Sequence, residues 1–247
     1  MPTVGCMSDV AKYLPLSQRG PEDESSVTGN WSTHLVTTLG ELAAILDRAS
    51  PSQLELPTTR AGFDVRTTVG HTLWHLGRSR IQRARDVTGV MIRGRMTRAA
   101  ALRELSRTIS PDSPTVCASA LRERAHGVGT SGQRSTVGDL SVAVVDGYSI
   151  AATLGTTLKV DPIASGAVAL ARSLSAPVEV RAVLQDRSLK ATDATWIVGR
   201  GRELAGTASE LVLFLWGLAG LPEHGTRHDR TATDAVGDAG GDGDTTA

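Results

Sequence analysis

Two histidines four positions apart, His71 and His75, are the residues of this sequence whose type and spacing suggest chemistry. Four residues make about one turn of an α-helix, so both imidazoles lie on one helix face. A histidine at mid-helix beside an apolar stripe has two interpretations. It is either a metal ligand that reaches into the centre of a helical bundle, or a half-buried histidine with a hydrogen-bond partner.

The segment that carries these histidines is predicted to form a helix that begins after Asp64 and runs towards Gly89. Asp64 is a suitable N-cap because its carboxylate accepts the free N–H groups of the first turn. Apolar residues recur at spacings of three and four, which marks the buried face: Val65, Val69, Leu73 and Leu76. The histidines are therefore expected beside the apolar stripe of a packed helix.

The composition bounds the fold and excludes some partners. A chain of 247 residues can hold one large domain or two small ones. Its 26 basic and 26 acidic residues cancel, so nucleic acid held by overall charge is not expected. Hydrophobic residues make up 40% of the chain but aromatic residues only 3%, so Leu, Val, Ile and Ala must build the core.

The cysteines and the apolar runs indicate a cytoplasmic protein without a membrane partner. Cys6 and Cys117 stand in no metal-type spacing, and two cysteines make no disulfide framework, which favours a reducing compartment. The longest apolar run, residues 211–221, has about half of the roughly 20 residues that a spanning helix needs. The N-terminus contains Asp9 and Lys12 and lacks the apolar stretch of a signal peptide.

An arginine-rich stretch follows the histidines, over residues 78–107, where arginines far outnumber the acids Asp86 and Glu104. It is expected to be mostly helical, with a break around residues 89–94 and a second helix from Thr97 to Thr108. Such a stretch is either a solvated helix face or a basic surface for nucleic acid or an anionic small molecule. No aromatic residue lies between these arginines, so stacking of nucleic-acid bases is not supported.

The composition also divides the chain into four parts. Residues 1–29 are predicted to be a disordered leader and residues 223–247 a disordered acidic tail, because both lack apolar periodicity. Residues 30–160 are predicted to be helical, with a first helix from Ser32 that ends at Ser50 and Pro51. Further helices are expected over residues 115–126 and 137–155, joined by a flexible Gly/Ser loop at residues 127–133.

Residues 161–222 are predicted to form a smaller α/β unit. Alternation over residues 177–184 predicts a half-buried strand, and residues 185–188 are expected to be a turn. Two more strands are expected over residues 195–198 and 202–205. A strongly apolar helix then follows from Gly206 to Trp216, as a core element packed on the small sheet.

Three segments together resemble the mycothiol-dependent maleylpyruvate isomerase family. The first is Gly62-Phe63-Asp64-Val65-Arg66 followed by Val69-Gly70-His71. The second is Asp146-Gly147-Tyr148-Ser149-Ile150-Ala151-Ala152-Thr153-Leu154-Gly155. The third has Gly206, Ala208, Leu211, Leu215, Trp216 and Gly217 in the order of the family's last helix. The resemblance covers roughly residues 31–221 and implies an N-terminal DinB-like four-helix bundle with a smaller C-terminal α/β domain.

The resemblance also implies a divalent-metal site, with Zn²⁺ as one suitable ion, in which His71 is a ligand. The family's second histidine falls on Asp146, and its glutamate falls on Val142, which supplies no ligand. His75 is the nearest residue that could complete the set. Without metal, Asp146 would be a buried carboxylate that needs a partner, and His71 as an imidazolium would be that partner.

Two functions stay open at this stage, and a nucleic-acid-associated protein that uses the arginine-rich stretch is a third. By resemblance, the chain is a thiol-assisted isomerase or transferase that uses a divalent metal and mycothiol on a carboxylate substrate, and Arg78, Arg80 and Arg83 would hold that carboxylate. Alternatively, it is a non-catalytic DinB-like protein that has lost the metal and binds a small ligand or a partner. The changed ligand set at Val142 and Asp146 favours the second.

Overall fold

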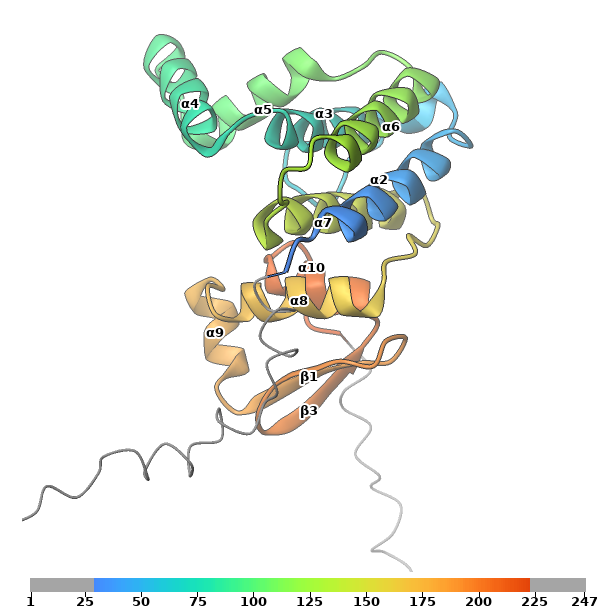
Figure 1. Cartoon of the computed structure of the whole chain (residues 1–247). Coiled ribbons are helices and arrows are strands. Elements are labelled where there is room, and N and C mark those ends of the chain that lie inside the picture. The colour runs from blue at the N-terminus through green and yellow to red at the C-terminus, as the bar shows by residue number, and fades with distance from the viewer. Residues whose placement is uncertain (1–28, 223–247) are drawn as a thin grey trace, which may run out of the picture.

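The computed structural model describes residues 29–222, so the predicted leader and tail lie outside the described residues, apart from residue 29. The described part is helix-rich with one three-stranded sheet, which confirms the predicted α+β class (Figure 1). The elements are α2 (Ser32–Leu46), the 3₁₀ helix η3 (Pro51–Glu55), α3 (Val65–Leu76), α4 (Arg80–Gly94), α5 (Arg98–Ile109), α6 (Pro114–Thr130), α7 (Val137–Thr153), α8 (Pro162–Ser173), α9 (Val178–Leu184), β1 (Arg187–Ala191), β2 (Ile197–Gly199), β3 (Arg202–Gly206) and α10 (Ala208–Leu215). Among residues 29–222, no helix combines the length and apolar character needed to cross a bilayer.

Four helices, α2, α3, α6 and α7, enclose the main apolar core. Helix α2 packs against α6 and α7, and α3 packs against the same two helices. The predicted stripe of α2 is confirmed, because the side chains that form it are buried: Leu35, Leu39, Leu42 and Leu46. Burial of each such aliphatic side chain contributes about 1.5–3 kcal/mol. Helix α6 runs on to Thr130, so the loop predicted from residue 127 begins later than expected.

The long helix predicted from Asp64 towards Gly89 is two helices. Asp64 caps α3 as expected, accepting a hydrogen bond from the Thr67 N–H at 2.6 Å. The chain then leaves the helix at Gly77, and Ser79 starts α4 through a capping box with Gln82. A serine three residues before a glutamine is itself a start signal. The break turns α4 away from the bundle.

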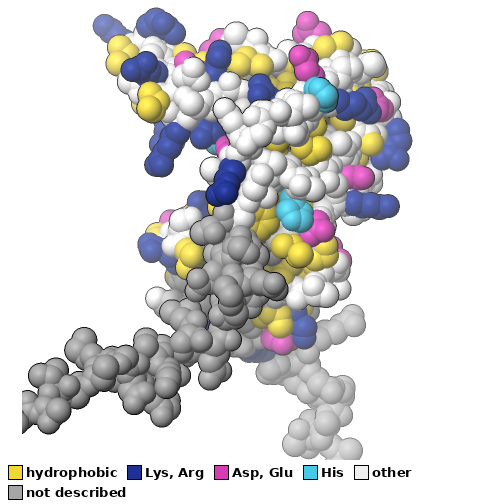
Figure 2. Space-filling model, in the orientation of Figure 1, with side chains coloured by type: hydrophobic (Ala, Val, Ile, Leu, Met, Phe, Trp, Pro, Cys, Tyr) yellow, Lys and Arg dark blue, Asp and Glu magenta, His cyan; other side chains and the backbone are white. Residues whose placement is uncertain are grey.

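Helices α4 and α5 form a hairpin in which α5 packs on α3 and α4 projects from the bundle (Figure 1). Helix α4 is continuous to Gly94, so the break predicted around residues 89–94 falls at its end. Its only buried residue is Val87, which packs with Trp74 and Ala101 in a small cluster separate from the main core. Helix α4 therefore rests on few apolar contacts, and a hollow lies beneath it, at the left of Figure 2.

The smaller C-terminal unit differs from the prediction in two elements. Residues 178–184 form helix α9 instead of the predicted strand. Strand β1 begins at Arg187, within the turn predicted over residues 185–188. The alternation there was misleading because only Val180 is buried, whereas Val178 is 64% exposed. Glu179 near the helix start and Arg181 near its end suit the helix dipole.

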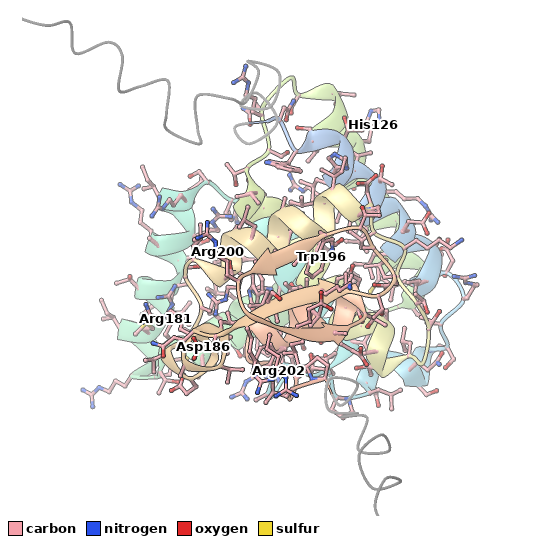
Figure 3. All side chains as sticks on the ribbon, turned by 90° about the horizontal axis from the view of Figure 1, so that it is seen from below. His126, Arg181, Asp186, Trp196, Arg200 and Arg202 are labelled. Atoms are coloured by element: carbon pink, nitrogen blue, oxygen red, sulfur yellow. The ribbon has the colours of Figure 1, made fainter. Side chains whose placement is uncertain are left out.

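The sheet has the order β2–β1–β3, with β1 antiparallel to β2 and parallel to β3. Viewed from below, it lies across α8 and α10, and Trp196 from the turn before β2 is at its upper edge (Figure 3). The Trp196 Nε1–H donates to Ser165 Oγ on α8 at 3.0 Å. Helices α8 and α10 in turn pack on α7, so the apolar core continues across the boundary predicted near residue 161.

Candidate functional site

The structure brings His71 and Asp146 together in the interior, although 75 positions separate them in sequence. Helix α3 carries His71 and α7 carries Asp146, and these two helices pack face to face. The His71 Nδ1 lies 2.6 Å from Asp146 Oδ2. His71 is 6% exposed and Asp146 is fully buried, so this is a solvent-shielded pair.

Two further groups hold the Asp146 carboxylate. The Arg60 Nη2 donates to Asp146 Oδ1 at 2.8 Å, and the Thr72 hydroxyl donates to Asp146 Oδ2 at 3.0 Å. Burial alone would raise the pKa of Asp146, but the opposing charges of His71 and Arg60 outweigh it, and the net pKa is lowered. The carboxylate is therefore ionised, and both of its oxygens already have partners.

A tight turn places Arg60 over this pair. The Phe63 N–H donates to the Arg60 carbonyl at 3.0 Å, which closes a four-residue turn. Its third residue, Gly62, has a φ of 76°, a conformation that glycine adopts without strain. The guanidinium of Arg60 lies 5.4 Å from the centroid of the Phe63 ring, and its Nε is buried without a hydrogen-bond partner among residues 29–222.

His75 does not join Asp146. Its Nε2 lies 3.6 Å from Asp139 Oδ1, one turn along α3 and two turns along α7 from the first pair. Arg83 reaches the same carboxylate at 3.4 Å, and its Nη1 also donates to the His75 carbonyl at 3.0 Å. The His75 imidazole, with Thr136 and Arg83, holds the pKa of Asp139 below its ordinary value despite partial burial.

These residues do not fit a divalent metal ion. Asp146 is committed to a guanidinium and a hydroxyl, Val142 offers no donor atom, and His75 is paired elsewhere. Within residues 29–222, no group of three or more His, Cys, Asp or Glu side chains has the arrangement of a metal site. A metal ligand set of His71, Asp146 and His75 would require Arg60 to leave, because a guanidinium and a divalent cation compete for one carboxylate.

A cavity of about 640 Å³ lies beside the pair, bounded by α3, α4, α5, α7 and the end of α10. We call it the α4 pocket. Its basic lining residues are Arg60, Arg80, Arg83, Arg98, His71 and His75, and its apolar ones are Trp74, Ala84, Val87, Met91, Leu102, Val142 and Trp216. Of the described residues that line it, none is acidic and one, Thr88, carries a hydroxyl.

Some arginines of the stretch 78–107 line one of two cavities. Arg80 and Arg98, at the starts of α4 and α5, line the α4 pocket and form no ion pair with any residue in the described range. Arg78, in contrast, lies 3.5 Å from Asp86 and faces a second cavity. Of the three arginines predicted to hold a carboxylate, Arg80 and Arg83 therefore line the α4 pocket and Arg78 does not, and Arg83 is already paired with Asp139.

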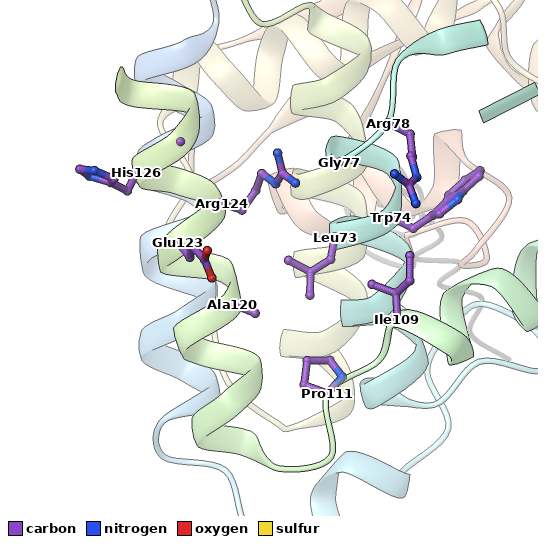
Figure 4. Close-up of a pocket in the computed structure, with 11 residues that line it drawn as sticks. Leu73, Trp74, Gly77, Arg78, Ile109, Pro111, Ala120, Glu123, Arg124 and His126 are labelled. Atoms are coloured by element: carbon purple, nitrogen blue, oxygen red, sulfur yellow. The ribbon is translucent and has the colours of Figure 1, made fainter. Parts of the chain in front are cut away.

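The second cavity, of about 610 Å³, lies between α3 and α6 (Figure 4). Leu73 and Ile109 form its apolar side, and Arg124 and Glu123 of α6 its polar side. The side chain of His126 points away from it (Figure 4). Mixed charge and a lining shared with solvent make this cavity a weaker candidate than the α4 pocket.

Sequence reasoning missed two charged residues of the site, Arg60, which pairs with Asp146, and Asp139, which faces His75. Asp139 had a local signal, since Thr136 and Asp139 form the capping box that starts α7. Arg60 had no such signal, because its partner lies 86 positions away. The chain matches no protein-family model, no curated protein and no solved structure.

Proposed function

We propose that this chain is a metal-free relative of DinB-like bundle proteins that binds a small organic anion with an apolar body in the α4 pocket. The observation that carries this proposal is the lining itself, in which arginines and histidines face the same space as Trp, Met, Leu and Val side chains without an acidic residue among them. Guanidinium groups recognise carboxylate, sulfonate and phosphate groups in a fixed geometry. The apolar wall would bury the remainder of the ligand.

The charge balance within the wall supports an anionic ligand. Arg60 and Arg83 are already neutralised by Asp146 and Asp139, whereas Arg80 and Arg98 have no counter-charge among the described residues. Two uncompensated cations at one cavity favour an incoming anion. The ligand is therefore expected to be held chiefly by Arg80 and Arg98, with its apolar part against Trp74 and Trp216.

Fluorescence titration with 8-anilinonaphthalene-1-sulfonate tests this proposal, because the probe is a sulfonate with an aromatic body. We expect saturable binding that quenches tryptophan emission from Trp74 and Trp216 and weakens as salt is added. Arg80→Gln combined with Arg98→Gln should weaken binding by about tenfold or more. The matched control is Arg85→Gln with Arg93→Gln, on the same helix but outside the pocket lining. Equal loss in both double variants, or no saturable binding, would contradict the proposal.

The second candidate, a thiol-assisted isomerase or transferase with a divalent metal and mycothiol, rests on the family resemblance. Its favouring observation is that His71 and Asp146 face each other across the α3–α7 interface, as the resemblance requires. Metal analysis of untagged protein separates the two candidates. Stoichiometric Zn²⁺ that disappears in His71→Ala supports the enzyme, whereas no bound metal after loading supports the anion-binding protein.

A further inference from the structure

A third cavity, of about 510 Å³, lies where the helical bundle meets the smaller C-terminal unit. The C-terminal end of α7, the connection of residues 154–161, the start of α8, the turn before β2 and the start of α10 contribute to its wall. Helices α8 and α10 pack on α7 below the bundle (Figure 1). We call this cavity the boundary pocket, and its size falls within the range of small-molecule sites in proteins.

The boundary pocket differs from the α4 pocket in the charges of its wall. Of the described residues that line it, one is cationic, Lys159, and one is anionic, Asp193. These two side chains form no ion pair with each other, nor with any other charged side chain among residues 29–222. One wall therefore carries two opposite charges that are both available to a ligand.

The start of α10 holds the Asp193 carboxylate in place. The Ala208 N–H, in the first turn of α10, donates to Asp193 Oδ1 at 2.6 Å. The positive end of the α10 dipole favours the ionised form of this carboxylate. Asp193 Oδ2 has no hydrogen-bond partner in the described part of the chain, so it is left to accept a hydrogen bond from a ligand.

Hydroxyl groups lie on the same wall. Thr156 and Thr157 of the connection and Ser209 of α10 line the boundary pocket, and their hydroxyls form no hydrogen bond with any residue from 29 to 222. A hydroxyl group both donates and accepts, so these side chains can support a bound anionic group as well as a bound cationic one.

The remaining surface of the boundary pocket favours an aliphatic group over a flat ring. Leu158 and Ala151 are buried members of the main apolar core and line the pocket. Tyr148 is the only aromatic residue of the lining within the described range, and it is 5% exposed, so it offers little ring face for stacking. Burial and the negative charge of Asp193 raise the pKa of the Tyr148 phenol, which keeps it neutral.

We infer that the boundary pocket binds a free α-amino acid with an aliphatic side chain. The α-carboxylate pairs with Lys159, the α-ammonium group donates to Asp193 Oδ2, and the side chain lies against Leu158. A zwitterion satisfies both charges of the wall at once, whereas a simple anion or cation leaves one of them without a partner. The inference does not depend on anion binding in the α4 pocket, because the two cavities share no described lining residue.

Isothermal titration calorimetry with L-leucine tests this inference. The titrations use the full chain with Arg80→Gln and Arg98→Gln, which removes anion binding at the α4 pocket from the measurement. Two matched probes each lack one charge, since 4-methylpentanoate has no ammonium group and 3-methylbutylamine has no carboxylate. We expect one-to-one binding of L-leucine, and binding of each matched probe at least about tenfold weaker. Tm should rise with the concentration of L-leucine, because the ligand binds the folded chain.

Two substitutions test the two charges separately. Asp193→Asn keeps an acceptor oxygen for the Ala208 N–H and removes the negative charge, whereas Lys159→Gln removes the cation at an exposed position. Each should weaken L-leucine binding at least about tenfold. Asp193→Asn should not weaken binding of 4-methylpentanoate, which has no ammonium group, and a merely structural effect would weaken both probes. The matched control is Asp186→Asn with Lys190→Gln, which lies outside the lining and should leave the affinity for L-leucine unchanged.

A blocking substitution tests the location of the ligand. Ala152→Trp, at an exposed position of the lining, should abolish L-leucine binding without removing either charge. The inference is overturned by no saturable binding of L-leucine, by equal affinity for 4-methylpentanoate, by equal loss in the control variant, or by unchanged affinity in Ala152→Trp. Titration of the unsubstituted chain with 8-anilinonaphthalene-1-sulfonate tests the α4 pocket by itself, so this inference and the proposed function can fail separately.

Discussion

The α3–α7 interface and the α4–α5 hairpin use charged residues in opposite ways. At the interface, the fully buried Asp146 is matched by Arg60, His71 and Thr72, so both of its carboxylate oxygens have partners at 3.0 Å or less. On the hairpin, Arg80 and Arg98 face the α4 pocket with no ion pair among the described residues. The first arrangement holds two helices in register, and the second leaves electrostatic attraction available for a ligand. The contrast predicts that removing a charge lowers the unfolding free energy at the interface, whereas at the hairpin it lowers the affinity for an anion.

The largest effect is expected from Asp146→Asn. The substitution leaves Arg60 and His71 beside a neutral amide in the interior, and breaking a buried ion pair typically costs about 3–5 kcal/mol. Urea unfolding followed by circular dichroism measures this loss. Asp112→Asn is the matched control, since Asp112 is almost fully exposed and its ion pair with Arg66 should contribute about 0–1 kcal/mol. Equal effects of the two substitutions would remove the distinction between the regions.

A second substitution tests the contact between the two regions, where α3 packs against α5. A Cβ on Gly70 would collide with the Ser106 carbonyl and the Ser110 side chain, so Gly70→Ala must push the helices apart. We expect a loss of about 1–3 kcal/mol in unfolding free energy. Gly40→Ala on α2 is the control, because a Cβ there meets open space and alanine favours a helix by about 1 kcal/mol. If Gly70→Ala left the unfolding free energy unchanged, the hairpin would have to pack less closely on α3 than the structure shows.

The pH dependence of stability should distinguish the interface carboxylates from exposed ones. The pKa values of Asp139 and Asp146 in the folded protein lie below the ordinary value of 3.8. The unfolded chain therefore binds more protons, so their stabilisation is complete well above pH 3.8 and is lost as the pH falls through the folded values. Urea unfolding at pH 5.5 and pH 3 should show a smaller acid-induced loss in Asp139→Asn than in the wild type. The same loss in both proteins would assign acid sensitivity to other groups.

The smallest effect on stability is expected from the hairpin arginines. Arg80→Gln and Arg98→Gln should change the unfolding free energy by less than about 0.5 kcal/mol, because both side chains are exposed and without a counter-charge in the described range. The same variants should weaken anion binding, as argued for the α4 pocket. A stability loss of several kcal/mol would show that these arginines are structural rather than part of a binding wall.

Local signals account for most of the helix boundaries. Asp64, Ser79, Thr97, Ser113, Thr136 and Thr207 each accept a backbone N–H at a helix start. The stripe of α2 and the apolar helix α10 were likewise visible as patterns. Prediction failed over residues 177–184, where a short alternating run was assigned to a strand. Seven residues are too few for periodicity to separate a strand from a helix, and burial there is decided by packing on β1.

The candidate site was predictable in part. His71 and Asp146 were expected to meet across a bundle, and the structure places them in contact. His75 was expected to complete a ligand set, but it lies one turn further along α3, where Asp139 rather than Asp146 faces it. The position of Arg60 could not be predicted, because the turn at Gly62 determines only its backbone direction and the buried carboxylate lies on another helix.

The sequence by itself determined the helices, their caps and the two faces that carry His71, His75, Asp139 and Asp146, because these depend on contacts within a few residues. Only the tertiary structure decided which imidazole meets which carboxylate, and that a guanidinium rather than a third ligand completes the cluster. The physical reason is that a buried charge takes whichever opposite charge the packing of distant segments brings within hydrogen-bond distance.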